Sequence, residues 1–506
     1  MKKLITYIKV AVILPFAWSC ADFLDKNPPD QLSSQMFWEN KADFENALTA
    51  VYGSLQNSMF SHGMPNWDVL TDNGYGQHNY WGSNPIVQGN VFPSTGGYIS
   101  SVYYDSYRAI ARVNIFLNHL AAYEGSDIGP QERSQFEGEA KYVRAFFYSF
   151  LYMSYGSVPL VLDPLSLEDQ FQPKVSDEEI RQQIITDLSD AIQQLPDVLY
   201  QNNNGHAVKS SAEALMARIL LYDAYDPQGN ARIDAMNEAL PYLASLMAAG
   251  YQLAPDYTEV FRDGTQEGNP EILFSIKFLA PDNFTPMDQW YGDWLVVSPL
   301  QNLVDTYEYT DGLPKGQSPL QDPNDEFANR DPRLGYTVFE DHVDWGGGNT
   351  HVPSNNRPTG YGLKKFLTPD LIPYGYSTRS QQDWVVSRFG EVLLMYAEVL
   401  NELEGPSQDV YNAVNRVRGR VGMPSLPVGL SQQEMRERIR HERRVELAFE
   451  GLRFYDLKRW KTAEEVLNAV DDGVIPYNFE SRFYKWPLPQ SEIDRNDGIL
   501  VQNPDY

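Results

Sequence analysis

The chain has 506 residues, of which 42% are hydrophobic and 21% are charged, a composition that is ordinary for a folded protein large enough to bury an extensive core. Its formal net charge of −28 repels nucleic acids and anionic lipid surfaces, so we expect neither as a partner of the folded part. The negative charge does not argue against a neutral ligand.

The first 19 residues have the pattern of an export signal. Three lysines precede an apolar run over residues 10–18, which is too short for a permanent membrane span. The run ends at Cys20, the only cysteine of the chain, which therefore cannot form an internal disulfide. We predict that residues 1–19 are a lipoprotein signal peptide and that Cys20 is lipidated. The alternative is an ordinary cleaved signal that leaves an unrelated free thiol.

Residues 20–35 are polar, contain prolines and show no hydrophobic period, which indicates a lipidated tether. Removal of residues 1–19 takes away three lysines and no acidic residue, so the formal net charge changes from −28 to −31. We predict a single folded domain over residues 36–506.

Helical periodicity runs from about residue 40 to about residue 250. Apolar residues from Phe44 to Leu55 recur at i, i+3, i+4 and i+7, the spacing of an amphipathic helix. Capping pairs at Ser176 and Glu179, and at Ser210 and Glu213, start two more helices. Further helices are predicted over residues 103–120, 135–155 and 237–248. Paired helices of this length indicate a tetratricopeptide-like array.

Residues 251–386 are rich in Gly, Pro, Asn, Asp, Tyr and Trp and show no sustained helical period. Short strand-like runs occur, as at residues 272–278. Because a structureless stretch of this length is unusual in a compact domain, we predict an inserted irregular lobe with a few short strands. Helical patterns resume over residues 387–460, including 387–404 and 407–421. The predicted fold class is mainly α.

Glu442 and Glu446 fall on the apolar stripe of a helix that Ser431 and Glu434 start with a capping box. A carboxylate on a buried stripe needs a cationic partner. We expect the partners among nearby arginines of the same stretch, namely Arg443, Arg444, Arg453 and Arg459. The two carboxylates beside His441 also fit a metal site or an acid/base pair, but the density of arginine favours structural ion pairs.

The C-terminal segments ERRVELAFEGLRFYDLKRW (442–460), WPLP (486–489) and QNPDY (502–506) resemble the signature of the SusD/RagB family, surface lipoproteins with which Bacteroidetes capture nutrient glycans. Residues 140–161 and FANRDPRL at 327–334 are similar to further family motifs, and Asp331 and Arg333 in the latter look like turn residues. The resemblance implies a SusD-like fold, a lipid anchor in the outer membrane with exposure at the cell surface, and a SusC-like TonB-dependent transporter as partner. Asp22 and Asp25 resemble the acidic export signals of such lipoproteins.

Common catalytic and cofactor motifs are missing from the sequence. It has no GxSxG elbow, no GxxxxGK[ST] loop, no HExxH and no paired Cys or His spacing for a transition metal. We therefore predict no catalytic residues, no cofactor and no metal. A glycoside hydrolase remains an alternative, because its two carboxylates need only meet in space. A peptide-binding protein of the same family is the other alternative.

Two stretches, residues 67–85 and 288–296, carry aromatic residues in places where no core period exists. Either these rings pack the lobe onto the helices or they face a ligand. We predict that they hold a glycan without cleaving it, with Trp81 and Trp290 as leading platforms. The candidate ligand-binding residues are Asp72, Asn73, His78, Tyr80, Trp81, Trp290, Tyr291 and Trp294.

Overall fold

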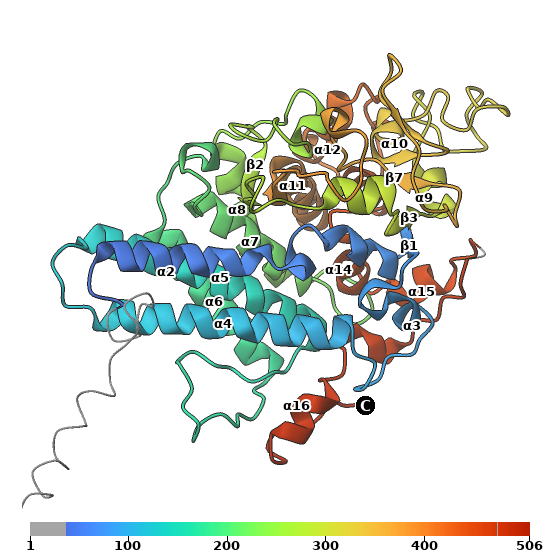
Figure 1. Cartoon of the computed structure of the whole chain (residues 1–506). Helices are drawn as coiled ribbons and strands as arrows, with labels where there is room; N and C mark the ends of the chain where they lie inside the picture. The colour runs from blue at the N-terminus through green and yellow to red at the C-terminus, as the bar shows by residue number, and fades with distance from the viewer. Residues whose placement is uncertain (1–36, 473) are drawn as a thin grey trace, which may run out of the picture.

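The computed structural model of this protein describes residues 37–472 and 474–506 (Figure 1). The predicted signal peptide over residues 1–19, the predicted lipidation of Cys20 and the predicted tether over residues 20–35 lie outside the described residues. The first described helix, α2 (Lys41–Gly53), starts with a capping box and buries the predicted apolar stripe from Phe44 onward.

Packed helices form the first half of the molecule, and α2, α4, α5 and α6 run side by side in Figure 1. Helix α5 contacts α4 and α6, and α7 contacts α6 and α8. The predicted helical array and the mainly α fold class are thereby confirmed. The helices after α2 are α3 (Ser83–Val87), α4 (Tyr98–Ala122), α5 (Pro130–Tyr155), α6 (Asp177–Gln194), α7 (Lys209–Tyr222) and α8 (Ile233–Ala248).

The capping predictions have mixed outcomes. Ser176 caps α6 with Glu179 as predicted. A helix begins near Ser210 as predicted, but Ser210 and Glu213 do not cap it, because α7 begins at Lys209 and both residues lie inside it. The Glu213 carboxylate instead accepts a hydrogen bond from Ser245 of α8, so its role is to join two helices. A capping pattern in the sequence does not distinguish a helix end from such a contact.

The lobe holds a few short strands, as predicted, and they form antiparallel pairs, one of them with β1 from outside the lobe. Strand β1 (Gly74–Gly76) pairs with β3 (Val297–Pro299), and β2 (Ile272–Ile276) pairs with β8 (Trp384–Arg388). The β2–β8 pair brings the start and the end of the lobe together, directly before the next helix. The remaining lobe elements are β4 (Val338–Phe339) with β7 (Gly362–Leu363), β5 (Val343–Asp344) with β6 (Thr350–His351), and helices α9 (Gln301–Thr306) and α10 (Pro332–Thr337).

The later helices return to the array, since α11 contacts α8, α12 and α13. They are α11 (Phe389–Glu404), α12 (Gln408–Arg420), α13 (Gln432–Glu446), α14 (Arg453–Arg459), α15 (Ala463–Asn468) and α16 (Gln490–Arg495). The described residues also form short helical segments: η2 (Ser54–Gln56), η3 (Ser58–Phe60), η4 (Met64–Leu70), η5 (Tyr80–Gly82), η6 (Tyr200–Asn202), η7 (Tyr257–Val260), η8 (Asp288–Asp293), η9 (Pro369–Leu371) and η10 (Ser481–Tyr484).

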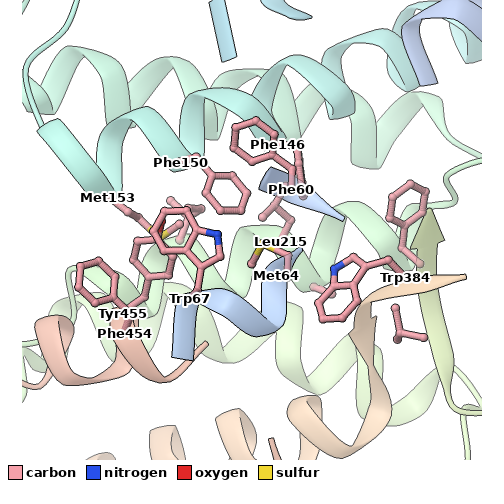
Figure 2. Close-up of a cluster of buried hydrophobic side chains, with 14 of the residues drawn as sticks. Phe60, Met64, Trp67, Phe146, Phe150, Met153, Leu215, Trp384, Phe454 and Tyr455 are labelled. Carbon is pink, nitrogen blue, oxygen red and sulfur yellow. The ribbon is translucent and has the colours of Figure 1, made fainter. Parts of the chain in front are cut away.

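A cluster of large apolar side chains joins the two ends of the chain to the helical array (Figure 2). Phe146 and Phe150 of α5 meet Phe60, Trp67 and Tyr455 there. The buried Trp486 of the WPLP turn stacks on Trp67 with the ring centroids 5.9 Å apart. The aromatic residues of 140–161 therefore build the core, as their helical spacing predicts.

Buried ion pairs hold the lobe to the C-terminal helices. Glu442 and Glu446 are only 1% and 0% exposed, so the prediction that they point inward is confirmed. Their partners were wrongly predicted, because the cations come from distant segments rather than from the same stretch. The partners are Arg333 of α10, Arg388 of β8, and Arg418 and Arg420 of α12.

The four arginines of residues 442–460 serve other carboxylates. Arg443 binds Asp456 and Glu391, Arg444 and Arg453 bind Asp72, and Arg459 binds Glu398 and Asp456. For Arg444 the reason is geometric, because it lies two positions from both Glu442 and Glu446, and residues two positions apart on a helix do not face each other. Asp331 caps α10 as a turn residue should, but Arg333 is a buried cation that reaches α13.

In the described part of the chain, no helix is long and apolar enough to cross a membrane.

Candidate functional site

The two aromatic stretches that the sequence singles out lie side by side. The β1–β3 pair joins them, with Tyr75 opposite Ser298. The backbone N–H of Leu300 donates to the carbonyl of Asn73 at 2.9 Å, and Nε2 of His78 lies 2.8 Å from the carbonyl oxygen of Trp294. One stretch thus belongs to the helical half and the other to the lobe, and together they form one surface.

Four half-buried rings form the centre of this surface, which we call the aromatic platform: Tyr80, Trp81, Trp290 and Trp294. Tyr80 stacks on Trp290, with ring centroids 5.3 Å apart and an interplanar angle of 29°. Trp81 meets the edge of the buried Tyr98 at 5.5 Å. The rings support one another and still reach solvent, as a surface for a flat apolar ligand face requires.

Backbone geometry fixes the position of Trp81. Its φ of 49° lies in the left-handed region, which costs a residue with a side chain about 1–3 kcal/mol and is concentrated at functional sites. A Cβ at Gly97 would collide with the backbone of Trp81, and a Cβ at Gly63 would collide with its ring. Gly97, at the start of α4, and Gly63, just before η4, therefore allow the chain to pack closely against Trp81 on two sides.

Trp290 lies on η8, a π-helical turn, a feature that is frequent at functional sites. Its ring also meets His62 edge-on at 5.1 Å. At the start of the turn, Asp288 is fully buried, and its Oδ1 accepts a hydrogen bond from the backbone N–H of Thr368 at 2.6 Å. Burial raises the pKa of Asp288 to about 7.

Three of the candidate residues lie beneath the surface and not on it. Asp72 is 2% exposed and accepts a bidentate pair from Arg453 at 2.9 and 2.8 Å. Burial alone would raise the pKa of Asp72, but the charges of Arg444 and Arg453 outweigh burial and lower it to about 2. Asn73 accepts from Arg444 at 2.9 Å. The buried Tyr291 donates its hydroxyl hydrogen to the carbonyl of His62 at 2.7 Å.

Matches to family models cover both halves of the chain. A model of the SusD family matches residues 275–506, and a model described as starch-binding associating with outer membrane, of SusD-like type, matches residues 22–221. The chain belongs to the SusD family. SusD-like protein P2 of Formosa agariphila is 27% identical to it over the full length of both chains.

Solved structures of SusD-like proteins share the fold. A SusD-like carbohydrate-binding protein of Bacteroides fragilis superimposes with a TM-score of 0.79 at 26% identity, covering 92% of this chain and 99% of that one. Surface glycan-binding protein A of Bacteroides thetaiotaomicron, solved in complex with laminarihexaose, superimposes with a TM-score of 0.69 at 20% identity, covering 92% and 99%. The latter likeness shows the fold alone.

One further ring of this SusD-family protein reaches the platform without having been predicted. Tyr376 is 79% exposed and meets the edge of Trp294 at 5.2 Å. It lies in the segment PYGYST, which contains glycine and proline. As in the other two stretches, an aromatic residue here occurs where the sequence has no core period. In the described residues, no group of three or more His, Asp or Glu side chains could hold a metal ion.

Proposed function

We propose that this protein is a glycan-binding protein that holds its ligand on the aromatic platform without cleaving it. The observation that carries the proposal is the convergence of exposed and half-buried rings from three separate loops, those of Trp81, Trp290 and Tyr376, on one surface. The description of the matching family model, starch-binding associating with outer membrane, and the name of the carbohydrate-binding relative at 26% identity support the same ligand class.

The chemistry of the platform suits sugars. Pyranose rings present apolar C–H faces that lie flat on Trp or Tyr, while their hydroxyls need donors and acceptors at the rim. The exposed His78 is the rim group beside Tyr80 that we assign to this task. Asp72, Asn73 and Tyr291 act from beneath, because their polar atoms already bind protein groups, and they fix the loops that carry the rings.

Substitution of the platform tryptophans tests the proposal. Trp81→Ala and Trp290→Ala are each expected to weaken binding about 3- to 10-fold, since one ring contact contributes about 0.5–1.5 kcal/mol. Affinity gel electrophoresis of residues 21–506 in laminarin, starch, xyloglucan and galactomannan measures the change. Phe92→Ala is the matched control, because Phe92 is an exposed ring (47%) outside the platform. Unchanged retardation in both tryptophan variants, or no retardation of the wild type, would reject the proposal. Sugar release from a polymer would instead favour the glycoside hydrolase.

We further propose that the protein is anchored in the outer membrane through lipidated Cys20 and passes its ligand to a SusC-like TonB-dependent transporter. The family description, which names association with the outer membrane, supports the location. A Cys20→Ala variant is expected to leave the outer-membrane fraction for the soluble fraction, while the wild type co-purifies with a barrel transporter. A Cys20→Ser variant serves as the isosteric control and should behave like Cys20→Ala. Retention of both variants in washed membranes lacking the transporter would show another anchor.

A further inference from the structure

A cleft of about 280 Å³ lies between the end of α2, the loop after η6 and the end of β2. The side chains that matter in its lining are Tyr52, Gln56, Asn204, His206, Lys277 and Asn283. Its volume is just under the roughly 300 Å³ at which pockets for small molecules begin, so it suits a ligand of one or two sugar rings and not a long chain. Packed rings connect this region to the platform: the buried Phe278, next to Lys277, meets His62, and His62 meets Trp290.

One wall of the cleft is held from behind by a buried carboxylate. Glu139 of α5 is 1% exposed and accepts hydrogen bonds from the hydroxyl of Tyr52 at 2.7 Å and from Gln135 at 3.0 Å. Its Oε2 also lies 2.7 Å from Nδ1 of His206. The rings of Tyr52 and His206 meet edge to face at 5.3 Å. This wall is therefore rigid before any ligand arrives, which lowers the entropic cost of binding.

The opposite wall is equally fixed. Nε2 of Gln56 donates to the carbonyl of Lys277 at 2.7 Å, and the ammonium of Lys277 pairs with Asp383 at 2.8 Å. Gly205 has a φ of +83°, and a Cβ there would lie 3.0 Å from Cγ of Lys277. Only a glycine lets this loop lie so close to the lysine stem.

The charges at the cleft are matched by protein partners. Lys277 is paired with Asp383, and the Glu139 carboxylate already binds Tyr52, Gln135 and His206. An anion or a cation therefore finds no uncompensated charge there. The groups that face a ligand are the exposed amides of Asn204 and Asn283, the exposed imidazole of His206 and the Tyr52 ring. Amides both donate and accept hydrogen bonds, as sugar hydroxyls do.

We propose that this cleft is a second subsite for a neutral saccharide, which binds one or two rings of a glycan whose other rings lie on the aromatic platform. The second half of this statement rests on the proposed function. The cleft itself has its own walls and polar groups, so it can bind a short neutral sugar when the platform is removed.

A variant that fills the cleft tests the proposal. Gly53 is exposed at the end of α2, lines the cleft and has open space where a Cβ would be, so Gly53→Trp is the substitution expected to occlude the cleft. Gly419→Trp is the matched control, because Gly419 is also exposed, lies in the last turn of α12 and has the same open space. Both are made in the Trp81→Ala/Trp290→Ala background, which removes the two leading rings of the platform and leaves Tyr80, Trp294 and Tyr376 identical in the two variants.

Saturation-transfer NMR with glucose, galactose, mannose, xylose and their disaccharides is the readout. We expect at least one sugar to receive saturation from the protein that lacks Trp81 and Trp290, Gly53→Trp to reduce this transfer strongly and Gly419→Trp to preserve it. No transfer to any sugar, or equal transfer in Gly53→Trp and Gly419→Trp, would overturn the subsite. The proposed function has a separate test. It is rejected if Trp81→Ala and Trp290→Ala, made in the otherwise intact protein, are retarded by polysaccharides as strongly as the wild type.

Discussion

Replacement of Arg388 by methionine is expected to lower the free energy of unfolding by about 3–5 kcal/mol, because it leaves buried carboxylates without their cation. Arg388 is 1% exposed, and its guanidinium lies 2.7 Å from Glu271, 2.7 Å from Glu446 and 2.6 Å from Glu450. Methionine fills much of the volume and carries no charge. Urea unfolding at pH 7, followed by tryptophan fluorescence, measures the loss.

Arg495→Met is the control for this prediction. Arg495 is 73% exposed and pairs with Glu492 at 3.2 Å on α16, and exposed pairs contribute only about 0–1 kcal/mol. We expect this variant to unfold at nearly the urea concentration of the wild type. If Arg388→Met and Arg495→Met lost the same free energy of unfolding, burial would not be the reason why the ion pairs of Arg388 stabilise the protein.

Replacement of Asp288 by asparagine is expected to stabilise the protein at pH 8 by about 2–4 kcal/mol, because burial raises the pKa of Asp288 from 3.8 to about 7 and one pKa unit corresponds to about 1.4 kcal/mol. Asparagine keeps the oxygen that accepts from Thr368 and has no charge to bury. Within the described residues, Oδ2 of Asp288 has no hydrogen-bond partner, so the bond from Thr368 to Oδ1 offsets only part of the cost of its ionisation.

The raised pKa of Asp288 also determines how its contribution to stability changes with pH. Between pH 3.8 and about 7 the folded protein holds a proton on Asp288 that the unfolded chain releases, so this residue's contribution to stability falls as pH rises through that window. Urea unfolding at pH 5 and pH 8 should therefore show a larger advantage of Asp288→Asn at pH 8. The exposed Asp282→Asn variant is the control. An advantage that is equal at the two pH values would contradict the raised pKa.

The sequence predicts the helices well because their information is local. The apolar period of α2 and the capping boxes of α6 and α13 lie within a few residues of chain. The ion-pair partners of Glu446 could not be predicted, since Arg333 lies 113 residues away and only the folded chain brings it close.

The same distinction between local patterns and long-range contacts applies to the candidate site. Both aromatic stretches are recognisable because their rings occur where no core period exists, and the structure brings them together through β1 and β3. Which ring faces solvent depends on the π-helical turn, where Trp290 and Tyr291 are adjacent yet Tyr291 is buried. The burial of Asp72 could not be foreseen either, because Arg453 lies 381 residues further along the chain.

That separation between Asp72 and Arg453 also constrains how the chain folds. Contacts between distant segments form only after a large loop has closed, and a high contact order slows folding. Here the backbone N–H of Phe449 also donates to Asp68, and Trp486 stacks on Trp67. The first and last quarters of the chain therefore pack against each other in the core. We infer that a nascent chain lacking its last 60 or so residues exposes the face that Trp486 would cover, and that folding ends only after the C-terminus is available.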